Sequence, residues 1–186
     1  MRVLITGGAG FIGANLVREC ERAGYECVVL DNLSTGRADN LEGTAARLVR
    51  GDVRSLDALA RVAEDTDAVV HLAARGSVPR SIADPLVTHE VNAGGTLNVL
   101  EAARITNGQQ VIVASSSSVY GANPELPKRE AAATRPLSPY AASKLAGESY
   151  ALAYGSSYGL PTLAFRFFNV FGQLQPAGHA LSLIHI

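Results

Sequence analysis

The sequence predicts an α/β protein built around a doubly wound parallel sheet, and three observations lead to that prediction. Short apolar segments alternate with segments of helical periodicity along the chain, a pattern typical of parallel strands joined by right-handed crossovers. The apolar segments show no polar alternation, which indicates strands buried on both faces. A glycine-rich turn, TGGAGFIG from Thr6 to Gly13, separates the first strand from the first helix, as in sheets that bind a ligand at the carboxyl ends of their strands.

The first half of the chain contains four predicted strands. Each is an aliphatic run bounded by turn residues, and we expect them over Arg2–Thr6, Glu26–Leu30, Ala46–Arg50 and Ala68–Leu72. A helix over Phe11–Ala23 carries its apolar residues on one face and ends at Gly24. A second helix runs from Ser55, its expected N-cap, to about Ala63.

The second half of the chain continues the alternation. A loop with Pro79 and Pro85 leads into a long helix over Val87–Ile105, which Gly94 and Gly95 interrupt, presenting a site for close packing. The remaining elements follow in order: a strand over Val111–Ala114, an irregular polar stretch from Gly121 to Pro139, a helix over Tyr140–Tyr158 and a strand over Thr162–Phe167.

Composition excludes several classes of protein. The 186 residues are 47% hydrophobic, which is enough to bury a core. Sixteen basic and seventeen acidic residues nearly balance, and no basic run could follow a nucleic-acid backbone, so we expect no nucleic-acid partner. No apolar run is long enough to cross a bilayer and the chain opens directly into a strand, so we expect no membrane association and a cytoplasmic location. Cys20 and Cys27 lack the spacing of metal ligands, so we expect small buried residues and no metal.

The glycine turn is typical of a Rossmann-type phosphate cradle. Gly7 would make the tight bend, Gly10 would let the backbone approach a pyrophosphate, and Gly13 would let the helix pack closely on the strand. A glycine turn with a purely structural role is the alternative. The strand before it, the helix after it and an acidic residue, Asp31, at the end of the next strand favour the dinucleotide interpretation.

The identity of the dinucleotide depends on Asp31. A carboxylate at this place hydrogen-bonds the ribose hydroxyls of NAD and repels the additional phosphate of NADP, although an Asp that caps a turn is the alternative. Asp52, after the third strand, either accepts the adenine amino group or belongs to an ordinary turn. Arg37 lies close enough in sequence to accommodate a 2′-phosphate, so NADP is disfavoured rather than excluded.

A candidate catalytic group follows the fifth strand. Tyr140 and Lys144 are four residues apart at the start of a helix and therefore lie on one face. A nearby ammonium would favour the phenolate and make Tyr140 a general base, although a solvent-facing helix pair is the alternative. A hydroxyl from the run Ser115 to Ser118 could share the same substrate oxygen, which favours the catalytic interpretation.

Seven motifs in order, TGGAGFIG, DNLSTG, GDV, HLAA, SSSSVYG, SPYAASK and RFFNVFG, resemble those of the extended short-chain dehydrogenases/reductases, within the NAD-dependent epimerase/dehydratase family. The resemblance covers residues 1 to about 172 and is greatest to nucleotide-sugar 4-epimerases. It implies that Tyr140 is the catalytic base, that Lys144 orients the nicotinamide ribose and lowers the pKa of Tyr140, and that Ser116 moves the sugar hydroxyl proton.

The same resemblance implies two sets of binding residues. Substrate would contact Ser77, Ser116, Ser117 and Asn169, and Phe168 would flank the nicotinamide together with Phe167. The implied NAD contacts are Gly7, Gly10, Phe11, Ile12, Gly13, Asp31, Asn32, Ser34, Gly36, Asp52, Val53, Leu72, Ala73, Ala74, Asn92, Tyr140, Lys144 and Phe167.

The implied reaction is a transient oxidation of a UDP-sugar at C4, followed by reduction of the 4-keto sugar on its other face. The segment SVPRSIADP, residues 77–85, ranks UDP-N-acetylglucosamine and UDP-glucuronate beside UDP-glucose as substrates. The related dehydratases carry Thr-Asp-Glu where this chain has Ser116, Ser117 and Ser118, so an epimerase is favoured over a dehydratase or reductase of the same family.

The family's chains continue into a smaller substrate domain, which is largely missing here. We therefore expect an NAD(P)-binding Rossmann domain over residues 1–175 and a truncated C-terminal stub over 176–186, whose apolar end does not resemble the relatives and is a candidate non-native tail. His185, in that tail, has no partner set that would make it a ligand. The resemblance also implies a homodimer through the helices near 87–105 and 140–158. A non-catalytic NAD-binding fragment is the alternative function.

Overall fold

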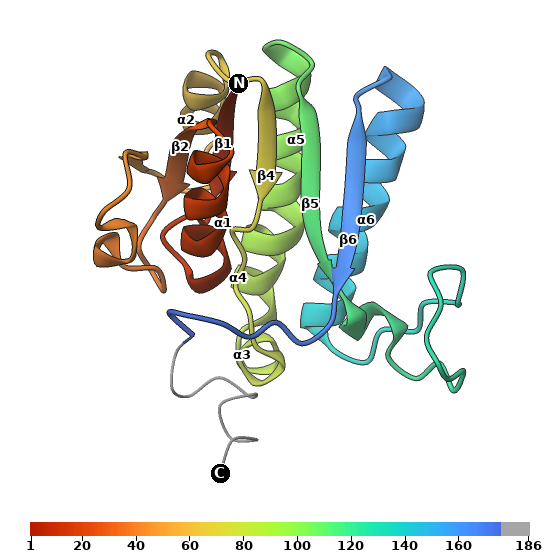
Figure 1. The fold of residues 1–186 in the computed structure, drawn as a ribbon. Helices are drawn as coiled ribbons and strands as arrows, with labels where there is room; N and C mark the ends of the chain where they lie inside the picture. Colours follow the sequence, from red (N-terminus) through yellow and green to blue (C-terminus); the bar gives the residue numbers. More distant parts are fainter. Residues whose placement is uncertain (176–186) are drawn as a thin grey trace.

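The computed structural model describes residues 1–175, which fold around a six-stranded parallel sheet with the order β3-β2-β1-β4-β5-β6 (Figure 1). The strands are β1 (Arg2–Thr6), β2 (Glu26–Asp31), β3 (Arg47–Arg50), β4 (Ala68–His71), β5 (Gln110–Ser116) and β6 (Thr162–Phe167). All neighbouring pairs are parallel. The order reverses direction between β1 and β4, so the predicted doubly wound sheet is confirmed, and its carboxyl edge is the expected ligand edge.

Helices pack on both faces of this sheet (Figure 1). Helix α1 (Phe11–Arg22) lies on one face, and α2 (Leu56–Ala63), α5 (Gly95–Ile105) and α6 (Pro139–Tyr158) lie on the other. The core divides accordingly, because successive side chains of a strand point to opposite faces. Val3 and Ile5 belong to the cluster with α1, whereas Leu4 belongs to the cluster with the other helices. Burial of β1 on both faces is therefore as predicted.

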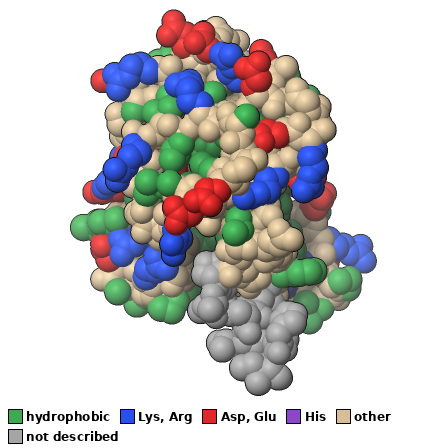
Figure 2. Space-filling model, turned by 60° about the vertical axis from the view of Figure 1, so that its left-hand side comes forward, with side chains coloured by type: hydrophobic (Ala, Val, Ile, Leu, Met, Phe, Trp, Pro, Cys, Tyr) green, Lys and Arg blue, Asp and Glu red, His purple; other side chains and the backbone are tan. Residues whose placement is uncertain are grey.

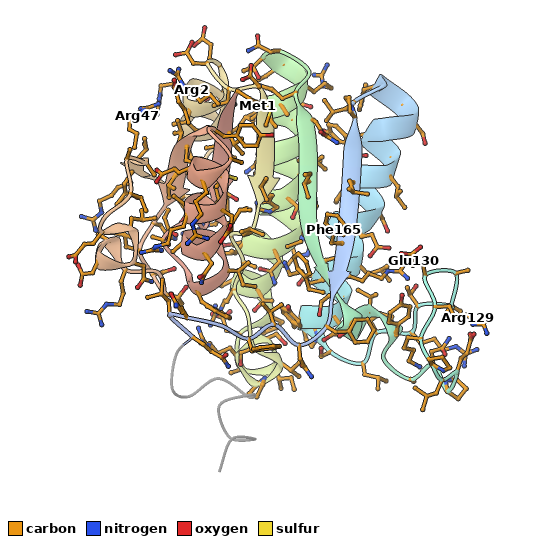
Figure 3. The ribbon with its side chains drawn as sticks, in the orientation of Figure 1. Met1, Arg2, Arg47, Arg129, Glu130 and Phe165 are labelled. Atoms are coloured by element: carbon orange, nitrogen blue, oxygen red, sulfur yellow. The ribbon has the colours of Figure 1, made fainter. Side chains whose placement is uncertain are left out.

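Strand β6 departs from that prediction. Leu163, Phe165 and Phe167 alternate along it and are 43%, 44% and 37% exposed. Figure 3 labels Phe165 on this part of the sheet. An apolar groove of about 210 Å³ runs beside them, lined by Ile12, Leu16, Val70, Leu72, Ile112, Ala114, Phe165 and Phe167. No element within residues 1–175 packs over this face of β6, so its aromatic residues remain open to solvent.

The segment before α5 contains more helix than the sequence predicts. In place of a loop, α3 (Val78–Ala83) and α4 (Pro85–His89) each carry a proline in the first turn, and Ser77 and Asp84 cap them. Proline is favoured at that position because its missing N–H has no intrahelical partner there. A π-helical turn over Glu90–Gly94 then separates α4 from α5. Gly95 explains the predicted close packing, since a Cβ there would lie 2.7 Å from Cγ2 of Val53.

The remaining predictions differ from the structure mainly at their ends. Strand β5 extends to Ser116 and is followed by a 3-10 turn over Ser117–Tyr120, and a second such turn covers Ala38–Leu41. Cys27 is buried as expected, but Cys20 is only partly buried. Within residues 1–175, no helix is long and apolar enough to cross a membrane, and no cluster of His, Cys, Asp and Glu could hold a metal. The predictions on His185 and residues 176–186 lie outside the described residues.

Acidic and basic side chains are mixed on the face of the molecule that Figure 2 shows. On the face drawn in Figure 2, Lys and Arg side chains are interspersed with Asp and Glu rather than gathered into one basic patch. A nucleic-acid backbone is bound through a concentrated positive surface, so the charge distribution on this face agrees with the balance of charges in the sequence.

Candidate functional site

The glycine turn lies at the carboxyl edge of the sheet, between β1 and α1. Gly7 has a φ of 72°, and a Cβ there would lie 2.6 Å from the backbone nitrogen of Ala73 on the neighbouring chain segment. A Cβ on Gly13 would lie 2.3 Å from the carbonyl oxygen of Gly7. Gly10 is the N-cap residue of α1 and no side chain caps the helix. A helix N-terminus in this state attracts an anion, so the turn fits a dinucleotide pyrophosphate.

Asp31 fixes the loop that lies beside the glycine turn. Its carboxylate accepts hydrogen bonds from the backbone nitrogens of Ala9 (3.0 Å) and Leu33 (2.8 Å), and the residue is 8% exposed. A Cβ on Gly36 would lie 3.0 Å from Oδ2 of Asp31, so the loop folds tightly over the carboxylate. Arg37 pairs with Asp39 at 3.1 Å in solvent. Asp31 thus holds the place expected of a ribose ligand, and it also orders its own loop.

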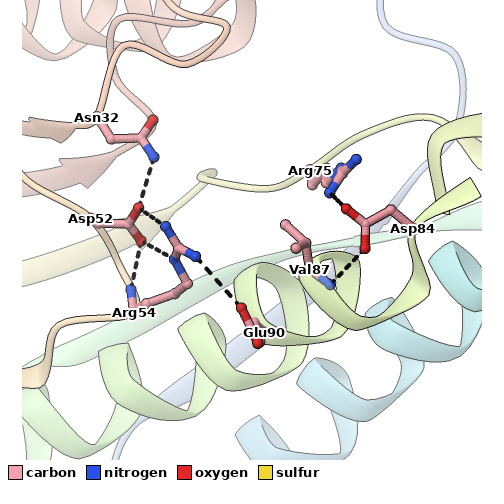
Figure 4. A network of polar contacts seen from close by, with 7 residues as sticks. All are labelled: Asn32, Asp52, Arg54, Arg75, Asp84, Val87 and Glu90. Atoms are coloured by element: carbon pink, nitrogen blue, oxygen red, sulfur yellow. Dashed lines mark hydrogen bonds and ion pairs between the residues drawn. The ribbon is translucent and has the colours of Figure 1, made fainter.

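Asp52 and Asn32 meet at the next position along the edge (Figure 4). The Asp52 carboxylate accepts from the backbone and guanidinium of Arg54 and, at 2.9 Å, from Nδ2 of Asn32. The hydrogen bonds from Arg54 hold the pKa of Asp52 well below its usual range, although burial opposes them. Arg54 also reaches Glu90 at 3.5 Å. Four donors therefore occupy Asp52, and an adenine amino group would have to replace one of them.

Tyr140 and Lys144 lie in the first two turns of α6. Ser138 caps this helix by accepting from the nitrogen of Ala141 at 3.1 Å, and Pro139 begins it. Lys144 is half-buried, and its Nζ donates to the carbonyl of Ala114 on β5 at 2.8 Å. Burial lowers the pKa of Lys144 to about 8. The helix thereby brings its ammonium directly under the end of β5, where the serines lie.

Ser116 faces Tyr140 from the end of β5. Burial raises the pKa of the Tyr140 phenol, and a hydrogen bond with the Ser116 side chain opposes that rise. Lys144 is not among the groups that shift this pKa, so the expected lowering by Lys144 does not appear, and desolvation of the phenol has the largest effect. Ser116 also accepts from the nitrogen of Ser118 at 3.1 Å and so caps the turn that follows. The three predicted catalytic residues lie together at one edge of the sheet.

A buried polar chain, which the sequence analysis did not identify, supports this edge from β4. The Thr96 hydroxyl donates to the carbonyl of Asn92 at 2.6 Å, so it accepts from Nε2 of His71 at 3.0 Å. Nδ1 of His71 then accepts from the hydroxyl of Thr6 at 2.7 Å. Burial first, and the charge of Lys144 second, lower the pKa of His71 to about 3, so the ring is neutral. The HLAA motif contains this histidine, but no pattern in the sequence pairs it with two threonines.

The side-chain amide of Asn92 is occupied by hydrogen bonds within the protein. Its Oδ1 accepts from the nitrogen of Arg75 at 2.7 Å, and its Nδ2 donates to the Ser143 hydroxyl at 2.9 Å. Arg75 in turn pairs with Asp84 at 2.8 Å (Figure 4). Asn92 is 1% exposed, so its side chain joins the loop after β4 to helix α6. Direct contact of this side chain with a cofactor stays a prediction.

The other predicted residues fall into three groups. Phe167 and Asn169 are exposed at and after the end of β6, and Phe168 lies 6.3 Å from the ring of Tyr120. Ser77 has a φ of 102°, a strained value that is found most often near functional sites. The side chains of two predicted cofactor residues, Ile12 and Leu72, line the apolar groove, whereas Val53 is core. The other predicted residues at this edge are Phe11, Ser34, Ala73, Ala74 and Ser117.

A larger hollow of about 640 Å³ lies at the opposite edge of the sheet, where its lining includes Arg2, Glu26 and Arg47. Figure 3 shows Arg2 and Arg47 at this amino-terminal edge, far from Glu130 near the ends of β5 and β6. The glycine turn and Tyr140 have no part in it. The carboxyl edge, which gathers the phosphate cradle and the proton-handling side chains, is therefore the candidate active site.

Comparisons with known proteins found similar chains among sugar-nucleotide epimerases and dehydratases. The UDP-glucose 4-epimerase of Azospirillum brasilense is 40% identical over 179 residues, which are 95% of this chain and 51% of that protein. The solved structure of a Thermus thermophilus UDP-glucose 4-epimerase in complex with NAD is 40% identical, with a TM-score of 0.92 over 100% of this chain and 60% of that one. A dTDP-glucose 4,6-dehydratase from Streptomyces venezuelae, with NAD and TYD bound, is 38% identical, with a TM-score of 0.92 over 98% of this chain and 60% of that one.

The chain thus spans about half of the curated relative and 60% of the two solved ones. A model of the NAD dependent epimerase/dehydratase family matches residues 3–185. Since that match extends over almost the whole sequence and ends beyond the glycine turn, Ser116, Tyr140 and Lys144, the chain belongs to the NAD-dependent epimerase/dehydratase family.

Proposed function

We propose that the protein is an NAD-dependent nucleotide-sugar 4-epimerase and that residues 1–175 are its dinucleotide-binding domain. The observation that carries this proposal is the meeting of Ser116, Tyr140 and Lys144 beside an uncapped α1 N-terminus at one edge of the sheet. The glycine turn fits NAD, because Gly7 and Gly13 let the backbone pack closely and the N-terminus of α1 is left without a side-chain cap for a pyrophosphate. NAD, when bound, supplies the acceptor and then the donor of hydride.

The protein's own side chains handle the proton in this reaction. Tyr140 takes the proton of the sugar 4-hydroxyl as hydride leaves C4, and returns it when the 4-keto sugar is reduced on the other face. Ser116 shares the proton through its hydrogen bond with Tyr140. We assign to Lys144, held against Ala114, the positive charge that stabilises the phenolate as the proton moves, although Lys144 does not lower the pKa of the resting phenol. Because the phenol is desolvated, this stabilisation is needed for Tyr140 to act near neutral pH.

UDP-glucose is the substrate we propose first, with UDP-N-acetylglucosamine and UDP-glucuronate as the other candidates. The named epimerase relatives act on UDP-glucose. The similarity to a dehydratase keeps that reaction as the second candidate. Against it, positions 117 and 118 carry hydroxyls rather than the carboxylates with which the related dehydratases drive elimination of water. A cytoplasmic location and a UDP-sugar partner belong to the same proposal.

Replacing the base tests the proposal. Tyr140→Phe should abolish interconversion of UDP-glucose and UDP-galactose in the complete protein while NAD binding persists, because only the phenolic oxygen is lost. Tyr158→Phe on the same helix is the matched control, since Tyr158 is 58% exposed at the far end of α6 and takes no part in the site. Turnover can be followed with a coupled assay and NAD binding by calorimetry. Full activity in Tyr140→Phe would refute the assignment. Retained NAD binding without turnover in the parent would favour a non-catalytic NAD-binding protein.

A homodimer through the helical layer is also proposed. Leu86, Tyr150 and Leu152 on α4 and α6 are 76%, 40% and 63% exposed. Large apolar side chains on one side of a protein are typical of an interface. Light scattering of the complete protein should give twice the chain mass, and a monomer over the micromolar range would contradict the proposal.

A further inference from the structure

Two charged side chains beneath the candidate active site form a close ion pair. Arg166 on β6 donates from Nε to both carboxylate oxygens of Glu148 on α6, at 3.1 and 3.0 Å, and from Nη2 to Oε1 at 2.5 Å. The side chain of Glu148 is 9% exposed and that of Arg166 20% exposed. A pair in this geometry joins the helix that carries Tyr140 and Lys144 to the last strand of the sheet.

The pair also reaches the segment that carries the catalytic serine. Ser115 donates to Oε2 of Glu148 at 2.8 Å, and in the strand register Ser115 stands beside Arg166 while Ser116 stands beside Phe167. Ser116, whose hydroxyl faces Tyr140, therefore directly follows Ser115, which is hydrogen-bonded to the ion pair.

Arg166 holds the connection between β5 and α6 at two further points. Its guanidinium lies over the ring of Tyr120, with Cζ 4.8 Å from the ring centre. Its Nη1 donates to the carbonyl of Glu130 at 2.9 Å, and Figure 3 shows Glu130 in the loop beyond the end of β6. One side chain thus contacts the turn that follows Ser116 and the loop that leads to Tyr140.

The energy of the pair depends on all these contacts. Burial by itself would raise the pKa of Glu148, but the hydrogen bonds and charge of Arg166 and the hydrogen bond of Ser115 hold that pKa below its usual value. A buried carboxylate that loses its partner is strongly destabilised. The Glu148 carboxylate and the Arg166 guanidinium are therefore stable only while they are paired, and their pairing restrains the backbone of α6 and β6 around them.

We propose that Glu148 and Arg166 are positioning residues, which together with Ser115 set the distance between the Ser116 hydroxyl on β5 and the Tyr140 phenol on α6. The inference rests on the proposed function, because it assigns the pair a part in the same proton transfer. Neither residue touches a reacting atom. Displacement of a catalytic group by about 1 Å can reduce a rate by about a hundredfold, so loss of the pair should reduce turnover far more than binding.

Three variants of the complete protein test the proposal: Ser115→Ala, Glu148→Gln and Arg166→Lys. Ser115→Ala leaves the ion pair intact and removes one hydrogen bond, so it keeps the test available if Glu148→Gln fails to fold. Arg166→Lys retains the charge but loses the two-pronged contact and the stacking on Tyr120. Turnover is divided by the folded fraction, and the KM for UDP-glucose and the affinity for NAD are measured beside it.

A second Arg–Glu pair on the helical layer provides the control. Arg104 donates to both oxygens of Glu101 at 2.8 and 2.6 Å and lies over the ring of Tyr158 at 5.1 Å, at the other end of α6. Glu101→Gln therefore breaks a similar contact without any connection to Ser116. If the pair of Glu148 and Arg166 only stabilised the fold, Glu148→Gln and Glu101→Gln would have the same effect on kcat per folded molecule.

We expect kcat to fall about 10- to 100-fold in Glu148→Gln and about tenfold in Ser115→Ala and Arg166→Lys, with KM and NAD affinity within about twofold of the parent. Glu101→Gln should leave kcat unchanged. If all four variants had the kcat of the parent per folded molecule, the inference would be overturned. If the parent itself turns over no UDP-sugar, the proposed function fails, and crystal structures decide the positioning: an unchanged Ser116–Tyr140 distance in Glu148→Gln overturns it, and a lengthened distance supports it.

Discussion

Adding one methyl group should have different effects at two glycines of the same turn: at Gly13 it should lower stability, and at Gly10 it should weaken NAD binding. A Cβ on Gly13 would lie 2.3 Å from the carbonyl oxygen of Gly7 and 2.5 Å from Cα of Gly8, so backbone would have to move. A Cβ on Gly10 has only the carbonyl oxygen of Gly7 within 4 Å, at 3.2 Å, which a shift of a few tenths of an ångström relieves. Gly10→Ala should therefore leave the fold intact and place its methyl where a pyrophosphate approaches.

The magnitudes follow from these distances. Inserting a methyl group into closely packed surroundings costs about 1 to 3 kcal/mol, and contacts of 2.3 and 2.5 Å with backbone put Gly13→Ala in the upper part of that range. A loss of about 2 to 3 kcal/mol lowers the melting temperature of a domain of this size by about 4 to 12 °C. Gly10→Ala should lower it by about 1 °C and weaken NAD binding more than tenfold, about 1.4 kcal/mol or more.

Differential scanning calorimetry without NAD, and titration calorimetry with NAD, separate the two effects. Gly24→Ala is a useful third variant, because nothing lies within 4 Å of its Cβ and its only strain is a φ of 81° in a remote turn. It should lower stability modestly and leave NAD affinity unchanged. If Gly13→Ala melts at the parent's temperature, or if Gly10→Ala binds NAD as the parent does, the division of roles within the turn is wrong.

Three further substitutions probe charge and protonation. Ser116→Ala removes the hydrogen bond that opposes the raised pKa of Tyr140, so the increase of kcat with pH should move to higher pH, and an unmoved pH–rate profile would contradict this. His71 is neutral in the folded state, with a pKa of about 3, so the unfolded state alone binds a proton as the pH falls below about 6.5. Through this residue, the free energy of unfolding should fall by about 1.4 kcal/mol as the pH is lowered from 7.5 to 5.5. In urea unfolding experiments, the His71→Gln variant should lack this part of the pH dependence. Asp31→Ala should weaken NAD more than NADP, which calorimetric titration of both dinucleotides checks; an unchanged ratio would argue against a ribose contact.

The fold could be predicted from local patterns because each strand is an apolar run with its own turn residues. Ser55 was recognisable as a cap and indeed accepts from the nitrogen of Ala58. The pair α3 and α4 was missed because Pro79 and Pro85 were interpreted as loop residues, whereas each lies in the first turn of a helix. The exposed side of β6 could not be foreseen either, since an apolar strand has the same sequence whether or not another element covers it.

The sequence predicted those residues of the candidate site that lie close together along the chain. Tyr140 and Lys144 are one helical turn apart, and Asp31 follows a strand, so short patterns identify them. Glu148 and Arg166 are 18 residues apart and His71 and Thr96 are 25 apart, so only the fold brings them together. Burial reversed one expectation, since the desolvation of Tyr140 outweighs its neighbours in setting its pKa.

Because Glu148 pairs with Arg166, its carboxylate is not available to form an ion pair with Lys144. Glu148 lies four residues after Lys144, a spacing at which a carboxylate and an ammonium on a helix commonly pair. Instead, its two oxygens accept from Arg166 and Ser115, and no carboxylate within residues 1–175 forms an ion pair with Lys144. The neutral ring of His71 adds no compensating charge. The positive charge of Lys144 is therefore not neutralised by an ion pair within residues 1–175, as its proposed role beside a Tyr140 phenolate requires.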